Sequence, residues 1–452
     1  MSEKEEAIKE SALVEGVPEE PVKTPEGMDG LKEEKLVADD SEKGGASKKK
    51  VLGICLGIGI AVVVIIAVVV AVIMMNNQGG DDVSDQDGDS VVVDVDEEKV
   101  VLENTELSSG SVTTTIGGKS ITYNGAYVVD GIEATISSGV YESVADDEVV
   151  FLVINGGSLV IDGDVTISKT GSADFAGRGD NYSFYGTNSA IVVVGDGSSA
   201  SINEATINTS VSGANAVVAT NGGVIGISDS EISTTADNSR GLHATYTGAI
   251  EADDVKISTQ GGSCAALATD RGAGSIVAND MTLSTAGAGS PLIYSTGDIT
   301  VTDSTGVATG AQIAVVEGKN SITLGDCDFS ANGIGNRGSV DNAGVMIYQS
   351  MSGDADEGTG SFTATDCTFT VLADSSVYTT TPFFFVTNTT ATIKLTDVTA
   401  NFYEDGYFIL ASGTDEWGRS GKNGGIVTLD VSNLKATNTN VGVDNISSVN
   451  EV

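Results

Sequence analysis

Basic residues are scarce in this chain of 452 residues, which has 22 Lys and Arg against 64 Asp and Glu and a formal net charge of −42. A nucleic-acid-binding protein holds the phosphate backbone with clustered Lys and Arg, so this balance argues against a nucleic-acid partner. The same excess of negative charge argues against docking of the protein on an anionic lipid surface.

Proline, cysteine, histidine and aromatic residues are also few, with 5 Pro, 4 Cys, 1 His and 5% aromatics. Four cysteines in this length do not make a disulfide scaffold, and a single histidine argues against a zinc cluster and against several Ser-His-Asp constellations. The 57 glycines and the many β-branched residues instead favour a β-rich fold over a helical one.

One long apolar segment stands near the N-terminus. Residues 51–75 read VLGICLGIGIAVVVIIAVVVAVIMM, without a charge, and about 20 apolar residues suffice to span a bilayer. No small-residue cleavage site follows the segment, so it predicts an uncleaved signal anchor. Lysines at 48–50 precede it and Asp81 and Asp82 follow, which places the N-terminus in the cytoplasm and the C-terminal part outside the cell. We therefore expect a single-pass plasma-membrane protein.

The segments on either side of the span are strongly acidic. Residues 1–50 have few apolar side chains and predict a disordered cytoplasmic tail. Residues 76–105 predict an extended extracellular linker whose charges repel one another. The remaining residues, 106–452, contain the folded ectodomain.

A short pattern repeats along this ectodomain: an aliphatic residue, a small residue, an acid and then Ile, Leu or Phe, with intervening positions free. The spacing is often about 25 residues and reaches about 40 where a loop intrudes. The copies include SINEATI ending at Ile207, IGISDSEI at Ile232, IEADDVKI at Ile257, IVANDMTL at Leu283, ITLGDCDF at Phe329 and FTATDCTF at Phe369.

A second apolar segment lies within each repeat and runs into a Gly or Asn turn signal, as in AVVATNGG at 216–223 and GLHATYTG at 241–248. Short strands at this repeat length, without helical periodicity between them, exclude a βαβ fold. They predict an all-β parallel β-helix, a solenoid whose coils stack so that equivalent Ile and Leu residues form one internal row. Roughly ten coils at about 4.8 Å each give a length on the order of 50 Å.

The acid of the repeat recurs at one position in every copy, so these carboxylates should line one corner of the solenoid. Asp commonly caps a turn, and the alternative is a calcium-binding ladder, because spaced carboxylates are hard oxygen ligands. We therefore expect no cofactor, with calcium as the open alternative. Cys327 and Cys367 share the following position and should stack as small core residues, or form a geometrically demanding disulfide. The acids are Glu204, Asp229, Asp254, Asp280, Asp303, Asp326, Asp366 and Asp397.

Several stretches are similar to a known family. SRGLHATYTG (239–248), CAALATDRG (264–272) and VMIYQSMSGDAD (345–356) resemble right-handed β-helix surface proteins of the pectate-lyase-like fold, over roughly residues 110–450. The resemblance implies a right-handed solenoid at the cell surface with an adhesin-like or carbohydrate-binding role. The family's solenoid continues past the segment similar to VGVDNISSV (441–449), so we expect an incomplete C-terminal cap.

Polar and basic residues of neighbouring repeats predict a binding patch. Counted back from the Gly that ends the second apolar segment of each repeat, these residues fall near the same strand and turn. Such a mixture of charged and polar side chains would bind an acidic or hydroxyl-rich sugar. The alternative is a salt-bridged surface strip in which His243 is an ordinary exposed histidine. A second candidate is Trp417, whose indole could stack on a sugar ring in a polar loop, or form a structural plug. The patch comprises Arg240, His243, Asp270, Arg271, Tyr294 and Glu317.

The function expected from these patterns is that of an adhesin-like or glycan-binding module that contacts an extracellular glycan or the surface of a host or neighbouring cell. A repetitive solenoid supplies a long face for multivalent, individually weak contacts. The alternatives are a polysaccharide lyase or glycoside hydrolase on the same fold, or a purely structural surface protein. Catalysis is the less expected outcome, because the NTD, DD and GHG motifs of pectin hydrolases are not recognisable together, and we assign no catalytic residue.

Overall fold

The structure is a computed structural model, and it describes residues 103–335, 342–350, 354–371, 381–402, 406–413, 424–438 and 443–449. These residues belong to the unit Glu97–Val452. The predicted cytoplasmic tail, the predicted span at 51–75 and almost all of the predicted linker lie outside the described residues. Within the described part of the chain, no helix has the length and apolar character needed to cross a membrane.

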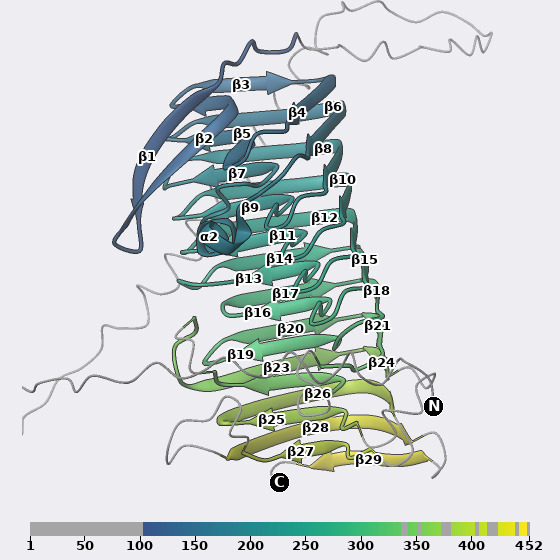
Figure 1. The fold of residues 1–452 in the computed structure, drawn as a ribbon. Helices are drawn as coiled ribbons and strands as arrows, with labels where there is room; N and C mark the ends of the chain where they lie inside the picture. The colour runs from purple at the N-terminus through teal and green to yellow at the C-terminus, as the bar shows by residue number, and fades with distance from the viewer. Residues whose placement is uncertain are drawn as a thin grey trace, which may run out of the picture. The chain divides into compact units, whose positions relative to one another are not determined.

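The described chain is all-β apart from one short insertion, and most of its strands pair in parallel (Figure 1). Successive passes of the chain add strands to two sheets in turn, so neighbours within a sheet are one pass apart. The first sheet, called sheet A, contains in spatial order β1 (Gly110–Ile116), β2 (Lys119–Asp130), β5 (Glu148–Ile154), β7 (Ile191–Val194), β9 (Val217–Thr220), β11 (Leu242–Thr245), β13 (Leu267–Thr269), β16 (Ile293–Ser295), β19 (Ala314–Glu317), β22 (Val345–Tyr348), β25 (Phe384–Thr387) and β27 (Ile409–Ala411).

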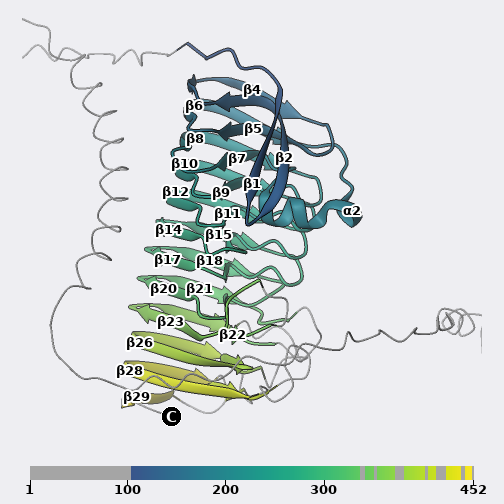
Figure 2. The same cartoon turned by 90° about the vertical axis from the view of Figure 1, so that its left-hand side faces the viewer.

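The second sheet, called sheet B, is bent along its length (Figure 2). In several coils one long strand passes round the bend, and in others two short strands replace it. The strands of sheet B are β3 (Glu133–Ile136), β4 (Gly139–Ser143), β6 (Ser158–Lys169), β8 (Ser199–Thr209), β10 (Val224–Thr234), β12 (Ala249–Thr259), β14 (Ser275–Asn279), β15 (Thr282–Thr285), β17 (Asp298–Thr302), β18 (Thr305–Ala308), β20 (Ser321–Gly325), β21 (Asp328–Ala331), β23 (Thr359–Thr365), β24 (Thr368–Val371), β26 (Thr389–Phe402), β28 (Gly425–Asn438) and β29 (Val443–Val449).

The pairings of sheet B include a closed circuit, because β12 pairs with two short strands of the following coil and β26 pairs with two short strands of the preceding coil. Between them the short strands form two parallel rows, and the residues that separate the two rows in each coil lie at the bend. The circuit runs through β12, β14, β17, β20, β23, β26, β24, β21, β18 and β15.

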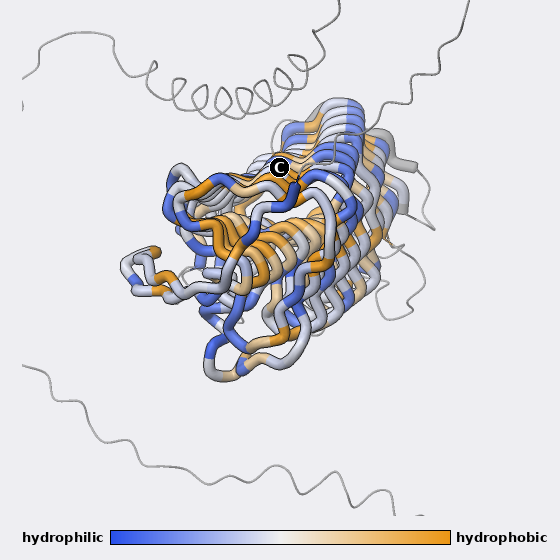
Figure 3. Tube along the Cα trace, turned by 90° about the horizontal axis from the view of Figure 1, so that it is seen from above, coloured by the Kyte–Doolittle hydropathy of each residue, from blue (hydrophilic) through white to orange (hydrophobic). Residues whose placement is uncertain are grey.

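The register confirms the predicted internal row. Ile207, Ile232 and Ile257 lie opposite one another in β8, β10 and β12, and Leu283 of β15 follows in the next coil. All four side chains are buried in one continuous hydrophobic core. A view along the stack shows the apolar residues gathered inside the coils (Figure 3). These stacked parallel strands fit a solenoid-like fold.

The recurrent acids lie at the bend of sheet B, as the repeat predicted. All eight are exposed and adopt a left-handed backbone, with φ between 47° for Asp229 and 55° for Glu204. Most residues with a Cβ avoid this conformation, whereas Asp and Asn tolerate it because of their short polar side chains. The acid is therefore placed where the chain turns between the two rows, and Asn433 fills the same position in β28 with φ 62°.

Two segments that lack the repeat cover the outer face of sheet A near its N-terminal end. One is the antiparallel hairpin of β1 and β2, and the other contains the short helix α2 (Phe175–Asp180) and the π-helix η1 (Asn181–Tyr185). Both lie on the same side of the stack (Figure 2). Their apolar residues form a second buried cluster with Leu152, Val192 and Val218 of sheet A. The outer face of sheet A is therefore an interior surface in this region.

Candidate functional site

The predicted patch is brought together on the outer face of sheet A, but it is largely buried. His243 continues the row of Val192 and Val218, and Tyr294 lies two coils further on. The exposed fractions are 0% for His243, 3% for Asp270 and 1% for Glu317. The interpretation of His243 as an ordinary exposed histidine is wrong, because this row of sheet A lies beneath other parts of the chain.

Arg240, His243 and Asp270 form one charged group. Arg240 Nη2 lies 3.2 Å from Asp270 Oδ2, and His243 Nε2 lies 3.7 Å from the same oxygen. Burial lowers the pKa of His243 to about 4, so the imidazole is neutral at physiological pH. Burial acts to raise the pKa of Asp270, but the contact with His243 and the charge of Arg240 outweigh it and lower that pKa. The group therefore contains one ion pair, between the Asp270 carboxylate and the Arg240 guanidinium, beside a neutral imidazole.

Glu317 is the centre of a second group. The hydroxyl of Tyr294 donates to Glu317 Oε2 at 2.6 Å, that of Tyr348 donates to the same oxygen at 2.8 Å, and Ser350 donates to Oε1. Burial raises the pKa of Tyr294 and Tyr348 well above the usual range, and the charge of Glu317 adds to this effect. Both phenols therefore stay protonated and are committed to the carboxylate.

Arg271 joins separate parts of the chain. Its guanidinium forms ion pairs with Asp354 and, at 3.5 Å, with Asp180 at the end of α2. The same group lies 3.5 Å from the centre of the Phe184 ring, a cation–π contact with η1. The sequence had grouped Arg271 with ligand-binding residues, and the structure places it as a link between sheet A and the segments that cover it.

Trp417, the remaining candidate, lies outside the described residues. The predicted aromatic stacking site therefore stays a prediction.

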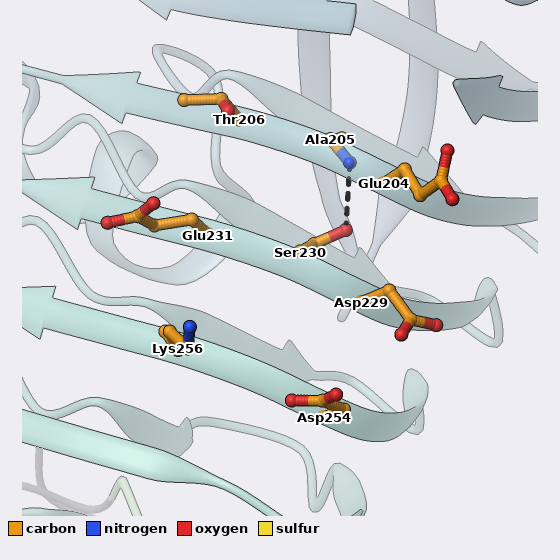
Figure 4. Close-up of a pocket in the computed structure, with 8 residues that line it drawn as sticks. All are labelled: Glu204, Ala205, Thr206, Asp229, Ser230, Glu231, Asp254 and Lys256. Carbon is orange, nitrogen blue, oxygen red and sulfur yellow. Dashed lines mark hydrogen bonds between the residues drawn. The ribbon is translucent and has the colours of Figure 1, made fainter. Parts of the chain in front are cut away.

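An exposed groove on sheet B was not predicted from the sequence. It spans β8, β10 and β12 beside the bend and has a volume of about 300 Å³ (Figure 4). Glu231 lies opposite both Thr206 and Lys256 in the register, so these three side chains form one outward row beside the acids of the bend. The lining residues are Glu204, Ala205, Thr206, Asp229, Ser230, Glu231, Asp254 and Lys256.

Hydrogen bonds between coils hold polar side chains in ladders on the outer face of the same sheet. In one ladder Ser228 donates to Asn203 at 2.9 Å, and Asn203 donates to Asp162 at 3.0 Å. In a second, Thr302 donates to Asn279 at 2.8 Å and Asn279 donates to Asp253 at 2.7 Å. The signal for these ladders is present in the sequence as Asn, Ser, Thr and Asp at the repeat spacing, directly before the acid of the bend.

The acids at the bend do not assemble a metal site in the described part of the chain. No group of three or more His, Cys, Asp and Glu residues there is arranged to hold a metal ion. The carboxylates of the row come from separate coils, one acid per coil.

Comparison with known proteins adds no relative. No protein-family model matches the chain, and no curated protein is detectably similar to it. What the structure defines is a class of architecture, an all-β protein of stacked parallel strands. The resemblance to adhesin-like right-handed β-helix proteins stays a prediction.

Proposed function

We propose that this protein is anchored in the plasma membrane by residues 51–75 and displays a right-handed β-helix that binds a hydroxyl-rich glycan at the cell surface. Binding takes place along the outer face of sheet B and in the groove beside its bend. The protein retains the polymer and does not cleave it. The partner is a polysaccharide or the glycan coat of a host or neighbouring cell.

The observation that carries this proposal is the set of polar ladders on an exposed sheet face. Hydroxyl, amide and carboxylate groups are already held by their neighbours in the adjacent coil, as in the chain Ser228, Asn203 and Asp162. Groups that are ordered before binding lose little side-chain entropy when a ligand arrives. Because the ladders repeat from coil to coil, one polymer chain can make many weak contacts at once.

The groove supplies a place where such contacts concentrate. Its outward row carries a hydroxyl, a carboxylate and an ammonium group at Thr206, Glu231 and Lys256. These groups both donate to and accept from sugar hydroxyls. The acids of the bend, at Asp229 and Asp254, extend the acceptor side of the groove and repel polyanions. A neutral or amino-containing glycan fits this charge better than a uronic acid polymer.

Binding is favoured over catalysis because the titratable residues of the predicted patch are buried. General acid–base catalysis needs a titratable group that reaches the substrate. His243, Asp270 and Glu317 are buried, and the two carboxylates are held by other side chains in the described structure. Their geometry supports a role in holding neighbouring coils together at sheet A.

The test uses the purified full-length protein in detergent on immobilised plant, mucin and bacterial polysaccharides, with and without calcium. Retained protein and newly formed sugar ends are both measured. We expect retention without new ends, and a several-fold loss of retention in Glu231→Ala and Lys256→Ala. Glu106→Ala and Lys119→Ala remove the same charges from exposed positions outside the groove and outside the strands of sheet B, and are the matched controls.

Three outcomes contradict the proposal. New sugar ends that vanish in Arg240→Ala or Asp270→Ala would establish a lyase or hydrolase. Retention that falls equally in the groove variants and their controls would assign it to net charge alone. Absence of retention on every polymer would favour a protein partner or a purely structural role.

A further inference from the structure

The position that follows the acid of the bend points into the core in every coil. Its occupants are buried and form one row through the stack, with small, apolar and polar residues mixed. Cys327 and Cys367 are neighbours in this row, with exposed fractions of 2% and 1%. The row contains Ala205, Ser230, Val255, Met281, Ser304, Cys327, Cys367, Val398 and Leu434.

Serine has a defined task in this row. The hydroxyl of Ser230 donates to the carbonyl of Ser228 at 2.6 Å and accepts the amide of Ala205 from the preceding coil at 3.1 Å. Ser304 repeats both bonds, to the carbonyl of Thr302 at 2.6 Å and from the amide of Met281 at 2.9 Å. A side chain thus satisfies a backbone amide beside the bend, where an unpaired buried donor would be costly.

Cys327 and Cys367 occupy the same position with sulfur in place of oxygen. Cys327 Sγ lies 3.2 Å from the carbonyl of Gly325, and Cys367 Sγ lies 3.1 Å from that of Thr365. The amide of Cys327 lies 3.5 Å from Cys367 Sγ, as the serine pattern requires. Within the described row, this is the one place where two thiols occupy successive coils.

The register brings these two cysteines within disulfide range. The pairs on either side of them, Gly325 with Thr365 and Asp328 with Thr368, are in register between parallel strands. Adjacent strands lie about 4.8 Å apart, inside the Cα separation of about 4.4 to 6.8 Å that a disulfide spans. Both side chains point into the same interior row, and Cys367 Sγ already lies 3.5 Å from the amide of Cys327.

The thiols also influence each other directly. Hydrogen bonding between them raises the pKa of Cys327 and lowers that of Cys367. Cys367 is therefore the member of the pair that ionises more readily, and the thiolate is the attacking form in disulfide chemistry.

We propose that Cys327 and Cys367 form a disulfide that links two neighbouring coils. In the first step the Cys367 thiolate attacks a small-molecule or protein disulfide, forms a mixed disulfide and expels one thiol of the oxidant. In the second step the Cys327 thiolate attacks Cys367 Sγ and expels the other. Two cysteine thiols lose two protons and two electrons, and the oxidant leaves as two thiols. Because both sulfur atoms are buried, the exchange takes place before the coils close or during local opening.

The disulfide closes a loop between two cysteines that are 40 residues apart in the sequence. The enclosed segment makes one turn of the stack, with β21 and β23 in sheet B and β22 between them in sheet A. A covalent link beside β21 and β24 reinforces the pairing of these two strands. It also restricts the unfolded chain, an effect that grows with loop length.

The experiment counts thiols in the purified full-length protein after incubation with oxidised glutathione. Free thiols are alkylated in denaturant, with and without prior reduction, and the peptides are mapped by mass spectrometry. We expect two alkylated cysteines without reduction, Cys55 and Cys264, and four after reduction. We also expect one cross-linked peptide pair that is 2 Da lighter than the sum of its reduced parts.

Serine variants keep the test independent of folding failure. Cys327→Ser and Cys367→Ser place at these positions the residue that Ser230 and Ser304 already provide, so both should fold. Reduction should lower the thermal midpoint of the wild type and of Cys264→Ser, and should leave that of Cys327→Ser unchanged. Four alkylated cysteines in the oxidised wild type would overturn the proposal. A disulfide that joins two chains or includes Cys264 would also overturn it.

Discussion

The acids at the bend of sheet B adopt a left-handed backbone conformation, and substitutions at two positions of one strand can test whether this conformation selects them. Asp254 lies at the bend with φ 50°, and Lys256 lies two residues later in extended backbone on the same exposed surface of β12. A left-handed backbone costs a residue with a Cβ about 1–2 kcal/mol, and glycine avoids this cost. In extended backbone the preference is reversed, because β-branched residues fit a strand and glycine weakens it.

The magnitudes follow from these preferences. Asp254→Val should lower the free energy of unfolding by about 1–2 kcal/mol, since a β-branched residue tolerates positive φ least. Asp254→Gly should leave it unchanged or raise it slightly. At position 256, Lys256→Gly should lower it by about 0.5–1 kcal/mol and Lys256→Val should be close to neutral. The order of Gly and Val therefore inverts between two neighbouring exposed positions.

Urea unfolding of the full-length protein, followed by far-ultraviolet circular dichroism, measures all four variants. Asp254→Asn serves as the charge control, because Asn tolerates the left-handed region and removes only the negative charge. The same order of Gly and Val at both positions would refute the assignment of the bend to residue 254. A large effect of Asp254→Asn would show that charge, and not backbone conformation, selects the acid.

Three further predictions concern the interior and the covered face. Ile232→Ala should lower the free energy of unfolding by about 2–5 kcal/mol because it leaves a cavity in the core. Ser233→Ala, at the neighbouring position on the outer face, should change it by less than about 0.5 kcal/mol. Equal effects of the two variants in urea unfolding would show that the register is wrong. Between pH 6.5 and about 4, His243 is protonated in the unfolded chain and neutral in the fold. The free energy of unfolding should therefore decrease by up to about 3 kcal/mol as the pH falls through this range. The same pH dependence in His243→Leu would contradict this explanation. Glu317→Ala should lower stability by more than Glu317→Gln, whose amide oxygen can still accept from Tyr294 and Tyr348 while its Nε2 donates to the Ser350 hydroxyl. Equal loss in thermal unfolding would show that the charge itself matters.

The repeat made the solenoid-like core predictable. A pattern such as that ending at Ile232 recurs along the chain, often after about 25 residues, and equivalent positions of parallel coils must lie opposite one another. The same argument placed Asp229 and its equivalents at one corner and gathered Arg240, His243 and Asp270 on one face. Local periodicity was sufficient for these conclusions because neighbours in space are neighbours in the repeat.

Which faces are open to solvent was decided by the tertiary structure. The sequence suggested an exposed patch around His243, but the hairpin of β1 and β2, the insertion with α2 and η1, and the residues around Asp354 lie on that side of sheet A. These segments have no counterpart in the repeat, so periodicity says nothing about where they pack. Arg271 illustrates the point, since its partners Asp180 and Asp354 are 91 and 83 residues away in sequence.

The amino-acid sequence by itself determined the internal row, the corner that the acids occupy and the register, because each depends on a residue pattern that recurs in every copy of the repeat. The groove beside the bend needed three coils to be stacked before Thr206, Glu231 and Lys256 became one surface. The contact of Cys327 with Cys367 likewise depends on a turn of the stack that spans 40 residues and brings β23 and β24 into register with β20 and β21. Long-range packing fixes such features, because burial and exposure depend on what the rest of the chain places over a surface.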